Sequence, residues 1–110
     1  MTKIVAGAST MTLVNVFDVR PERADELLAV LTEATDDVMQ HIPGFISVNL
    51  HMADDKTHIV NYAQWQSRDH FQAMLQRDDA REHIGRAKEL CENFTPVVCQ
   101  PVHVVTAETD

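Results

Sequence analysis

The apolar residues change their spacing along the chain in an order that few folds accept. Residues 11–19, MTLVNVFDV, alternate between two faces with β-branched and aromatic side chains, which is typical of a strand. Residues 21–42 then repeat apolar side chains every three or four positions, which predicts one long amphipathic helix. The Pro-Gly pair at 43–44 ends that helix.

The second half of the chain repeats this change of spacing. Residues 45–52 and 57–67 are two further strands, and the short ADDK segment between them predicts a hairpin. Ser67 is a candidate N-cap for a short helix, which breaks at the charged RDD segment before a second helical piece at 79–92. Residues 95–108 read as the last strand.

This order of elements predicts an α+β fold of the ferredoxin-like, βαββαβ type. Its four strands form an antiparallel sheet, and its helices cover one face of that sheet. Pro101 lies inside the last predicted strand and favours an edge position or a bulge, because proline cannot donate to a sheet ladder. The length of 110 residues suits a single domain at 11–108, preceded by a flexible N-terminal arm at 1–10.

The sheet face without helices predicts an interaction between subunits. Counting alternate positions assigns to it a set of apolar side chains that is too large to leave in water as one patch. These are Val14, Val16, Ile46, Val48, Leu50, Val60 and Tyr62. We therefore expect a symmetric homodimer in which this face packs on a second copy of the chain.

Charge and composition exclude several classes of partner. The net charge is −8, with 17 acidic against 9 basic residues, and no basic cluster is present to neutralise nucleic-acid phosphates or anionic lipids. No apolar run approaches the roughly 20 residues of a membrane span. The N-terminal segment lacks the apolar stretch of a secretory signal, so we expect a cytoplasmic protein. Cys91 and Cys99 have no CxxC spacing and no disulfide pattern.

Two asparagines on neighbouring strands are the main candidates for a functional site. Asn61 and Trp65 share one face of the third strand, and Asn15 and Phe17 share one face of the first. In this topology the two strands are neighbours, so both amides project into the space between sheet and helices. A buried amide without a partner costs about 1–3 kcal/mol. Two of them favour a wet or ligand-filled cavity over a plain core. Trp65 by itself does not indicate a cavity, because a lone tryptophan in a small domain is usually a core anchor.

The histidines and the last helix give weaker signals. His83 and Arg86 are three residues apart, so both can reach one side of the helix at 79–92, as a candidate base and a candidate anion-holding group. A solvated helix face explains them about as well. If Asp54 and Asp55 form the hairpin turn, His51 and His58 lie opposite each other, but two ligands do not make a metal site, and we expect no bound metal. No glycine-rich nucleotide motif indicates a flavin or nicotinamide.

With these features the sequence resembles the antibiotic biosynthesis monooxygenase family of dimeric α+β barrel proteins. The resemblance covers about residues 12–106 and is sharpest at VNYAQWQS, 60–67, supported by PGF at 43–45. The Trp-x-Ser ending is common to the superfamily and indicates the fold. The Asn-Tyr-Ala-Gln-Trp strand is similar to that of the small anthrone oxygenases of aromatic polyketide pathways.

The resemblance implies a cofactor-independent monooxygenase that uses molecular oxygen as co-substrate. Its small aromatic substrate would be an electron-rich phenol, anthrone or quinol, oxidised to a quinone. The family's catalytic Asn and Trp correspond to Asn61 and Trp65, and its helix Arg falls within a residue of Arg86. Asn15, Phe17, Phe71, Met74 and His83 would line the substrate site. Phe71 stands where the family has a pocket Tyr, which removes a hydroxyl.

Two other functions stay open at this point. A haem-degrading branch of the superfamily uses a strand Asn, a helix Trp and a helix His, which correspond to Asn15, Met74 and His83; the Trp position is a mismatch. The acidic surface also offers no obvious cluster for haem propionates. The last alternative is a non-catalytic dimer that binds a small aromatic ligand, because fold alone does not establish activity.

Overall fold

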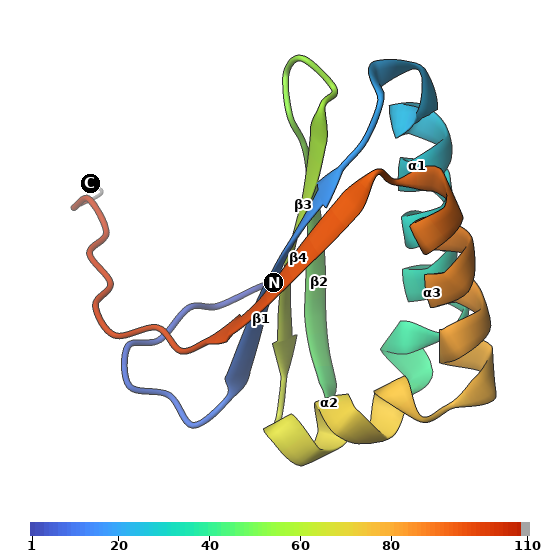
Figure 1. Ribbon diagram of the computed structural model, residues 1–110. Coiled ribbons are helices and arrows are strands. Elements are labelled where there is room, and N and C mark those ends of the chain that lie inside the picture. Colours follow the sequence, from blue (N-terminus) through green and yellow to red (C-terminus); the bar gives the residue numbers. More distant parts are fainter. Residues whose placement is uncertain (109–110) are drawn as a thin grey trace.

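A computed structural model describes residues 1–108. Its element order is β1 (Met11–Asp18), α1 (Pro21–Asp37), a short 3₁₀ helix η1 (Met39–His41), β2 (Phe45–Met52), β3 (His58–Trp65), α2 (Arg68–Leu75), α3 (Asp78–Leu90) and β4 (Asn93–Cys99). The strands form one antiparallel sheet in the order β2-β3-β1-β4. The helices cover one face of this sheet (Figure 1). The ferredoxin-like α+β fold expected from the sequence is confirmed.

Local sequence explains where the helices begin and which face they bury. Pro21 occupies the first turn of α1, where its missing N–H costs nothing. The buried residues Ala24, Leu27 and Val30 follow at spacings of three, so this face packs on the sheet. Ser67 caps α2 as expected: its Oγ accepts a hydrogen bond from the His70 N–H at 3.1 Å.

The first helix is shorter than the apolar stripe predicted. α1 ends at Asp37, and η1 carries the chain on to Ile42. Two adjacent aspartates at the carboxyl end of a helix are unfavourable toward its negative dipole end, and the β-branched Val38 leaves helical geometry with φ −124°. Ile42 still reaches the core, because the tighter 3₁₀ turn keeps it on the inner side.

The last strand is also shorter than predicted, and its range 95–108 is corrected to Asn93–Cys99. Cys99 pairs with Thr12, next to the start of β1, so residues beyond it have almost no partner strand left. Pro101 then lacks the N–H that a ladder needs. The predicted edge position is confirmed, since β4 is the outermost strand on its side of the sheet.

A β-bulge near the start of β2 corrects the assignment of its residues to the two faces. The pairing with β3 shifts between Phe45 and Ser47, so one extra residue stands at Ile46. Because a one-residue shift moves every later side chain to the other face, Val48 and Leu50 point toward the helices and not, as predicted, toward the bare face.

The hairpin between β2 and β3 is wider than expected. Asp54 and Asp55 do form the turn centre, since the Lys56 N–H donates to the Ala53 carbonyl at 2.9 Å. Lys56 adopts a positive φ of 61°, and Ala53 then pairs with His58. His51 therefore lies opposite Val60, so the prediction that it faces His58 is wrong.

The segments flanking the sheet have no regular secondary structure and touch its outer face. The arm at 1–10 makes hydrogen bonds from Thr2 Oγ1 to Asn49 Oδ1 at 2.7 Å and from Gln64 Nε2 to the Lys3 carbonyl at 2.6 Å. The Gly7 N–H donates to the Pro101 carbonyl at 2.9 Å. The flexibility of this arm stays a prediction. Within residues 1–108, no helix is both long and apolar enough to cross a bilayer.

Candidate active site

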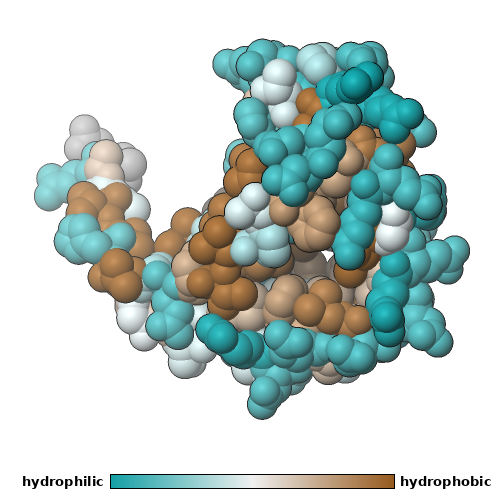
Figure 2. Space-filling view, viewed as in Figure 1, coloured by the Kyte–Doolittle hydropathy of each residue, from teal (hydrophilic) through white to brown (hydrophobic). Residues whose placement is uncertain are grey.

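A cavity of about 370 Å³ lies between the sheet and its helices. Figure 2 shows the hollow, with apolar residues around it and hydrophilic residues over the outer side of the helices. At about 30 Å³ for each molecule of liquid water, it equals the volume of roughly a dozen waters. It is within the range of small-molecule sites, about 300–1,000 Å³.

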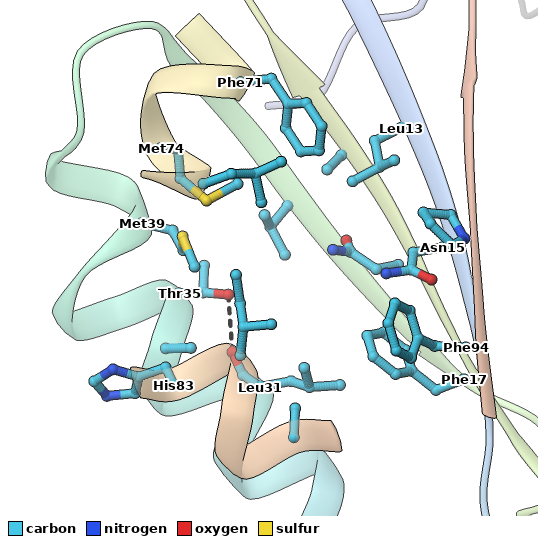
Figure 3. Close-up of a pocket in the computed structure, with 18 of the residues that line it drawn as sticks. Leu13, Asn15, Phe17, Leu31, Thr35, Met39, Phe71, Met74, His83 and Phe94 are labelled. Atoms are coloured by element: carbon cyan, nitrogen blue, oxygen red, sulfur yellow. Dashed lines mark hydrogen bonds between the residues drawn. The ribbon is translucent and has the colours of Figure 1, made fainter. Parts of the chain in front are cut away.

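Every helix and strand contributes to the wall of this cavity, and most of the wall is apolar (Figure 3). The sheet supplies Leu13, Asn15, Phe17, Val48, Leu50, Asn61, Ala63, Trp65, Phe94, Pro96 and Val98. The helices and η1 supply Leu31, Ala34, Thr35, Met39, Phe71, Met74, Leu75, His83, Ile84, Ala87 and Lys88. Thr35 is already satisfied, because its hydroxyl donates to the Leu31 carbonyl at 2.9 Å.

Asn15 and Asn61 are the polar centre of the wall. They are directly opposite each other on β1 and β3, and both line the cavity. Their Oδ1 atoms are buried and have no hydrogen-bond partner among the described residues. This confirms the prediction that the two amides share one space. An unpaired amide oxygen is costly in a core but useful in a binding site, where a ligand hydroxyl can donate a hydrogen bond to it.

Aromatic side chains close the cavity at both ends. Trp65 is 2% exposed and makes edge contacts with Phe45, at 5.6 Å between ring centroids, and with Phe71, at 6.3 Å. At the other end Phe17 stacks on Phe94 at 6.2 Å. In Figure 3 the Asn15 amide lies between the Phe71 end and the Phe17–Phe94 end. Trp65 thus acts both as a core anchor and as a wall of the cavity.

The structure brings His83 and Arg86 together, but their polar groups do not face the cavity. The Arg86 Nη1 lies 3.4 Å and the His83 Nε2 3.8 Å from the same carboxylate oxygen of Glu33 on α1. His83 Nδ1 is 2.9 Å from the Asp79 carbonyl. Figure 3 shows the His83 ring pointing away from the cavity, although the residue belongs to its wall. Arg86 is not part of the wall, so neither polar group occupies its expected place.

Other side chains that could bind a metal or react lie outside the cavity. His58 pairs with Asp18, Nε2 to Oδ1 at 3.2 Å, and residues 1–108 contain no group of three or more His, Cys, Asp or Glu arranged to hold a metal. Both cysteines are free. Burial raises the pKa of the Cys91 thiol, which keeps it protonated and a poor nucleophile.

Sequence reasoning missed several residues of the wall, and Lys88 is the charged one among them. It is positioned by α3 beside Ile84 and Ala87, which also line the cavity. Its Nζ lies 5.3 Å from the centroid of the Phe94 ring. The signal was available, because helical spacing places Ile84, Ala87 and Lys88 on one side of the helix predicted at 79–92.

Comparisons with known proteins converge on one family. Residues 10–86 match the family model for antibiotic biosynthesis monooxygenase. The chain is 36% identical over 103 residues to the tetracenomycin-F1 monooxygenase of Streptomyces glaucescens, an alignment that covers 94% of this chain and 91% of the relative.

Solved structures of two oxygenases are similar in fold. One is an alanine variant of SnoaB from Streptomyces nogalater, described as a cofactor-independent oxygenase, with a TM-score of 0.79 and 22% identity over 91% of this chain and 100% of that one. The other is the ActVA-Orf6 monooxygenase of Streptomyces coelicolor in complex with nanaomycin D. It has a TM-score of 0.79 and 23% identity over 91% of this chain and 94% of that one.

Proposed function

This chain belongs to the antibiotic biosynthesis monooxygenase family and is an enzyme, and on that basis we propose that it is a cofactor-independent monooxygenase. Its substrate class is an electron-rich aromatic: a phenol, an anthrone or a quinol. Its product is a quinone, and O₂ is the co-substrate. The observation that carries the proposal is an apolar cavity whose polar centre is two amides with unpaired oxygens, Asn15 and Asn61, and which has Trp65 at one end.

In the proposed reaction the substrate itself reduces O₂, and the protein supplies the binding site in which the two react. The deprotonated substrate passes one electron to O₂, and the two radicals combine to form a peroxide on the ring carbon. Loss of water then leaves a carbonyl. For an anthrone the balance is one CH₂ group plus O₂ giving one C=O group plus water, so no external reductant is consumed. The protein must favour the anion, hold it beside O₂ and exclude bulk water.

Specific side chains fit these tasks. The Asn61 amide donates a hydrogen bond to the substrate oxygen, where negative charge develops, and the Asn15 amide is an auxiliary donor. Trp65 is a flat wall for the aromatic ring, and its indole N–H helps to orient the substrate. Phe17 and Phe71 add apolar wall at the two ends of the cavity, and with Met74 they keep water out. We propose no direct role for Arg86 or His83, whose polar groups face Glu33.

A haem would not fit this site. Its iron would need an imidazole nitrogen free and directed into the cavity. In His83 one ring nitrogen lies against the Asp79 carbonyl and the other faces Glu33. His83 therefore offers no imidazole nitrogen to a haem in this cavity, and the account uses no haem.

We propose a homodimer as the working form. Valines of three neighbouring strands lie side by side on the face of the sheet without helices. Val16 on β1 pairs with Val60 on β3, and Val14 on β1 pairs with Val97 on β4, which is 48% exposed. A second copy of this face would bury that apolar strip. Light scattering after gel filtration should give twice the chain mass of 12.4 kDa. A monomer at micromolar concentration would contradict the dimer without touching the chemistry.

Oxygen consumption tests the function. Chelator-treated protein should consume O₂ with anthrone faster than the same solution without protein, one O₂ for each anthrone. Asn61→Ala should lower turnover about 10²–10³-fold, the usual effect of removing one donor to a developing oxyanion. Asn49→Ala is the matched control, because Asn49 lies on the opposite face of the sheet and should leave turnover within about twofold.

The same measurements distinguish an oxygenase from a protein that only binds a ligand. Equal turnover in Asn61→Ala and wild type would remove Asn61 from the mechanism. Absence of O₂ uptake, together with an increase in melting temperature on adding anthraquinone, would identify a ligand-binding protein without catalysis. Trp65→Phe should fold and turn over more slowly, because the ring that orients the substrate is smaller.

A further inference from the structure

The wall of the cavity contains a cation that the proposed chemistry does not use. Among the wall residues only His83 and Lys88 are ionisable, and the polar atoms of His83 face Asp79 and Glu33. Lys88 is the lysine of the last turn of α3. Within residues 1–108, no carboxylate lies within 4.0 Å of its Nζ, whereas Arg20, Lys56 and other surface cations have such partners.

Lys88 lies where the cavity meets solvent, because it belongs to the cavity wall and is itself exposed. In the view shared by Figures 1 and 2, the hollow opens between α3 and the edge strand β4. Lys88 belongs to α3 and Phe94 to β4, and the ammonium lies 5.3 Å from the ring centroid. A cation over an aromatic face is attracted to it, so Phe94 helps to hold the charge at the opening.

The register of the sheet gives the spacing along β1 between Asn15 and the residue that pairs with Phe94. Phe94 pairs with Phe17 on β1, two residues along the strand from Asn15. Two residues of strand correspond to about 7 Å. A flat ring system that reaches Asn15 and Asn61 with one oxygen and extends along β1 toward Phe17 would therefore have its other end near Phe94, the ring that the Lys88 ammonium contacts.

We infer that Lys88 is a substrate-binding residue and that the substrate is an aromatic acid, with a carboxylate at the end of the ring system opposite the reacting ring. The protein carries a net charge of −8, which repels an anionic ligand at long range. A single unpaired cation at the opening would give such a ligand a local partner and fix which end enters first. This inference rests on the proposed function for the identity of the ring, not for the binding itself.

An ordinary structural role for Lys88 makes a different prediction. A lysine in the last turn of a helix is also favoured by the helix dipole. That role would affect the stability of α3 and would not distinguish a charged ligand from a neutral one. The test is therefore the difference between two ligands of the same shape.

Binding of an anthraquinone carboxylate and of its methyl ester provides this comparison. Both ligands are anthraquinones, which resemble the proposed product and cannot be oxidised again at the same carbon. Their binding can be followed by quenching of the fluorescence of Trp65, the single tryptophan. Lys88→Met should raise the Kd of the carboxylate about tenfold, which is about 1.4 kcal/mol at 25 °C, and that of the ester less than about twofold. Lys88→Arg should keep the preference.

Arg81→Met is the charge-matched control. It removes one positive charge from the same helix at a residue outside the cavity wall, so long-range repulsion increases equally. An equal loss for both ligands, an equal loss in Arg81→Met, or no binding of the carboxylate to wild type would each overturn the inference. If wild type prefers the carboxylate to the ester but consumes no O₂, the role of Lys88 is supported and the monooxygenase function is refuted. If it consumes O₂ with anthrone but does not distinguish the two ligands, the monooxygenase function is supported and the role of Lys88 is refuted.

Discussion

Replacing Asn61 with leucine should stabilise the folded protein and abolish its turnover. The Asn61 Oδ1 is buried without a hydrogen-bond partner and borders the cavity. Leucine has a similar size, has no polar atom to satisfy, and would extend into existing empty space. The substitution therefore separates what the residue costs the fold from what it contributes to the site.

The size of the effect follows from the unpaired oxygen. Removing a buried group without a partner is worth about 1–3 kcal/mol. Water held in the cavity would pair with the amide and bring the gain toward the lower value. The unfolding entropy of a chain of this length is about 0.23 kcal/mol/K, at about 2.1 cal/mol/K per residue, so the melting temperature should rise by about 4–13 °C.

The assay compares two asparagines under identical conditions. Thermal unfolding is followed by circular dichroism at one protein concentration, because a dimer would make the midpoint depend on concentration. Asn49→Leu is the control. The Asn49 amide donates to the Tyr62 carbonyl at 3.0 Å and accepts from Thr2 Oγ1 at 2.7 Å. Losing these bonds should lower the stability by about 1–3 kcal/mol. Destabilisation of both variants alike would refute the claim that Asn61 is unpaired.

Four further predictions concern the fold, its electrostatics and the role of Arg86. Gly44→Ala should cost at least about 1–2 kcal/mol in a urea titration, because φ is +89° and an added Cβ would clash with the His70 ring. Gly85→Ala, inside α3 with no atom within 4 Å of the new Cβ, should instead stabilise by about 0.5–1 kcal/mol. Arg86→Ala should change turnover less than about threefold, and a loss of 10²-fold would show that the guanidinium leaves Glu33 during the reaction. Hydrogen bonding to Arg77 lowers the pKa of Asp79 from its usual 3.8, so the ionised carboxylate stabilises the fold above about pH 4 and this contribution is lost as the pH falls below that. Asp79→Asn should therefore reduce the fall in melting temperature between about pH 4 and lower pH. An unchanged fall in melting temperature would contradict the prediction.

The sequence was sufficient wherever strand alternation is unbroken. β1 and β3 pair without interruption from Met11 with Trp65 to Asp18 with His58. Counting alternate residues therefore brought Asn15, Asn61 and Trp65 to one face correctly. The apolar spacing along α1 likewise predicted the burial of Ala24, Leu27 and Ala34 but missed Val30. Its prediction for Ile42 is confirmed although the helix ends early, because the 3₁₀ turn continues the same side of the chain.

Backbone irregularities account for the errors. The bulge at Ile46 moved Val48 and Leu50 into the cavity wall, and the positive φ of Lys56 shifted the hairpin by two residues, which separated His51 from His58. Nothing in the local sequence marks a bulge at an isoleucine, since β-branched residues favour regular strands.

The helix side of the site depends on tertiary packing. His83 and Arg86 are on one side of α3 as predicted, but that side meets Glu33 of α1. The orientation follows from the buried Ala80 and Ala87, which turn a different stripe of the helix toward the sheet. Helical spacing indicates which residues share a face, and the packing of the whole domain decides what that face meets.

The most direct test of the account is single-turnover oxidation of anthrone under ¹⁸O₂ by the chelator-treated protein, with the product analysed by mass spectrometry. A cofactor-independent monooxygenase places one labelled oxygen in the quinone and the other in water, at a rate well above that of the solution without protein and strongly reduced in Asn61→Ala. An unlabelled quinone, or a labelled one formed equally fast by Asn61→Ala, would contradict the assignment of the chemistry to this cavity.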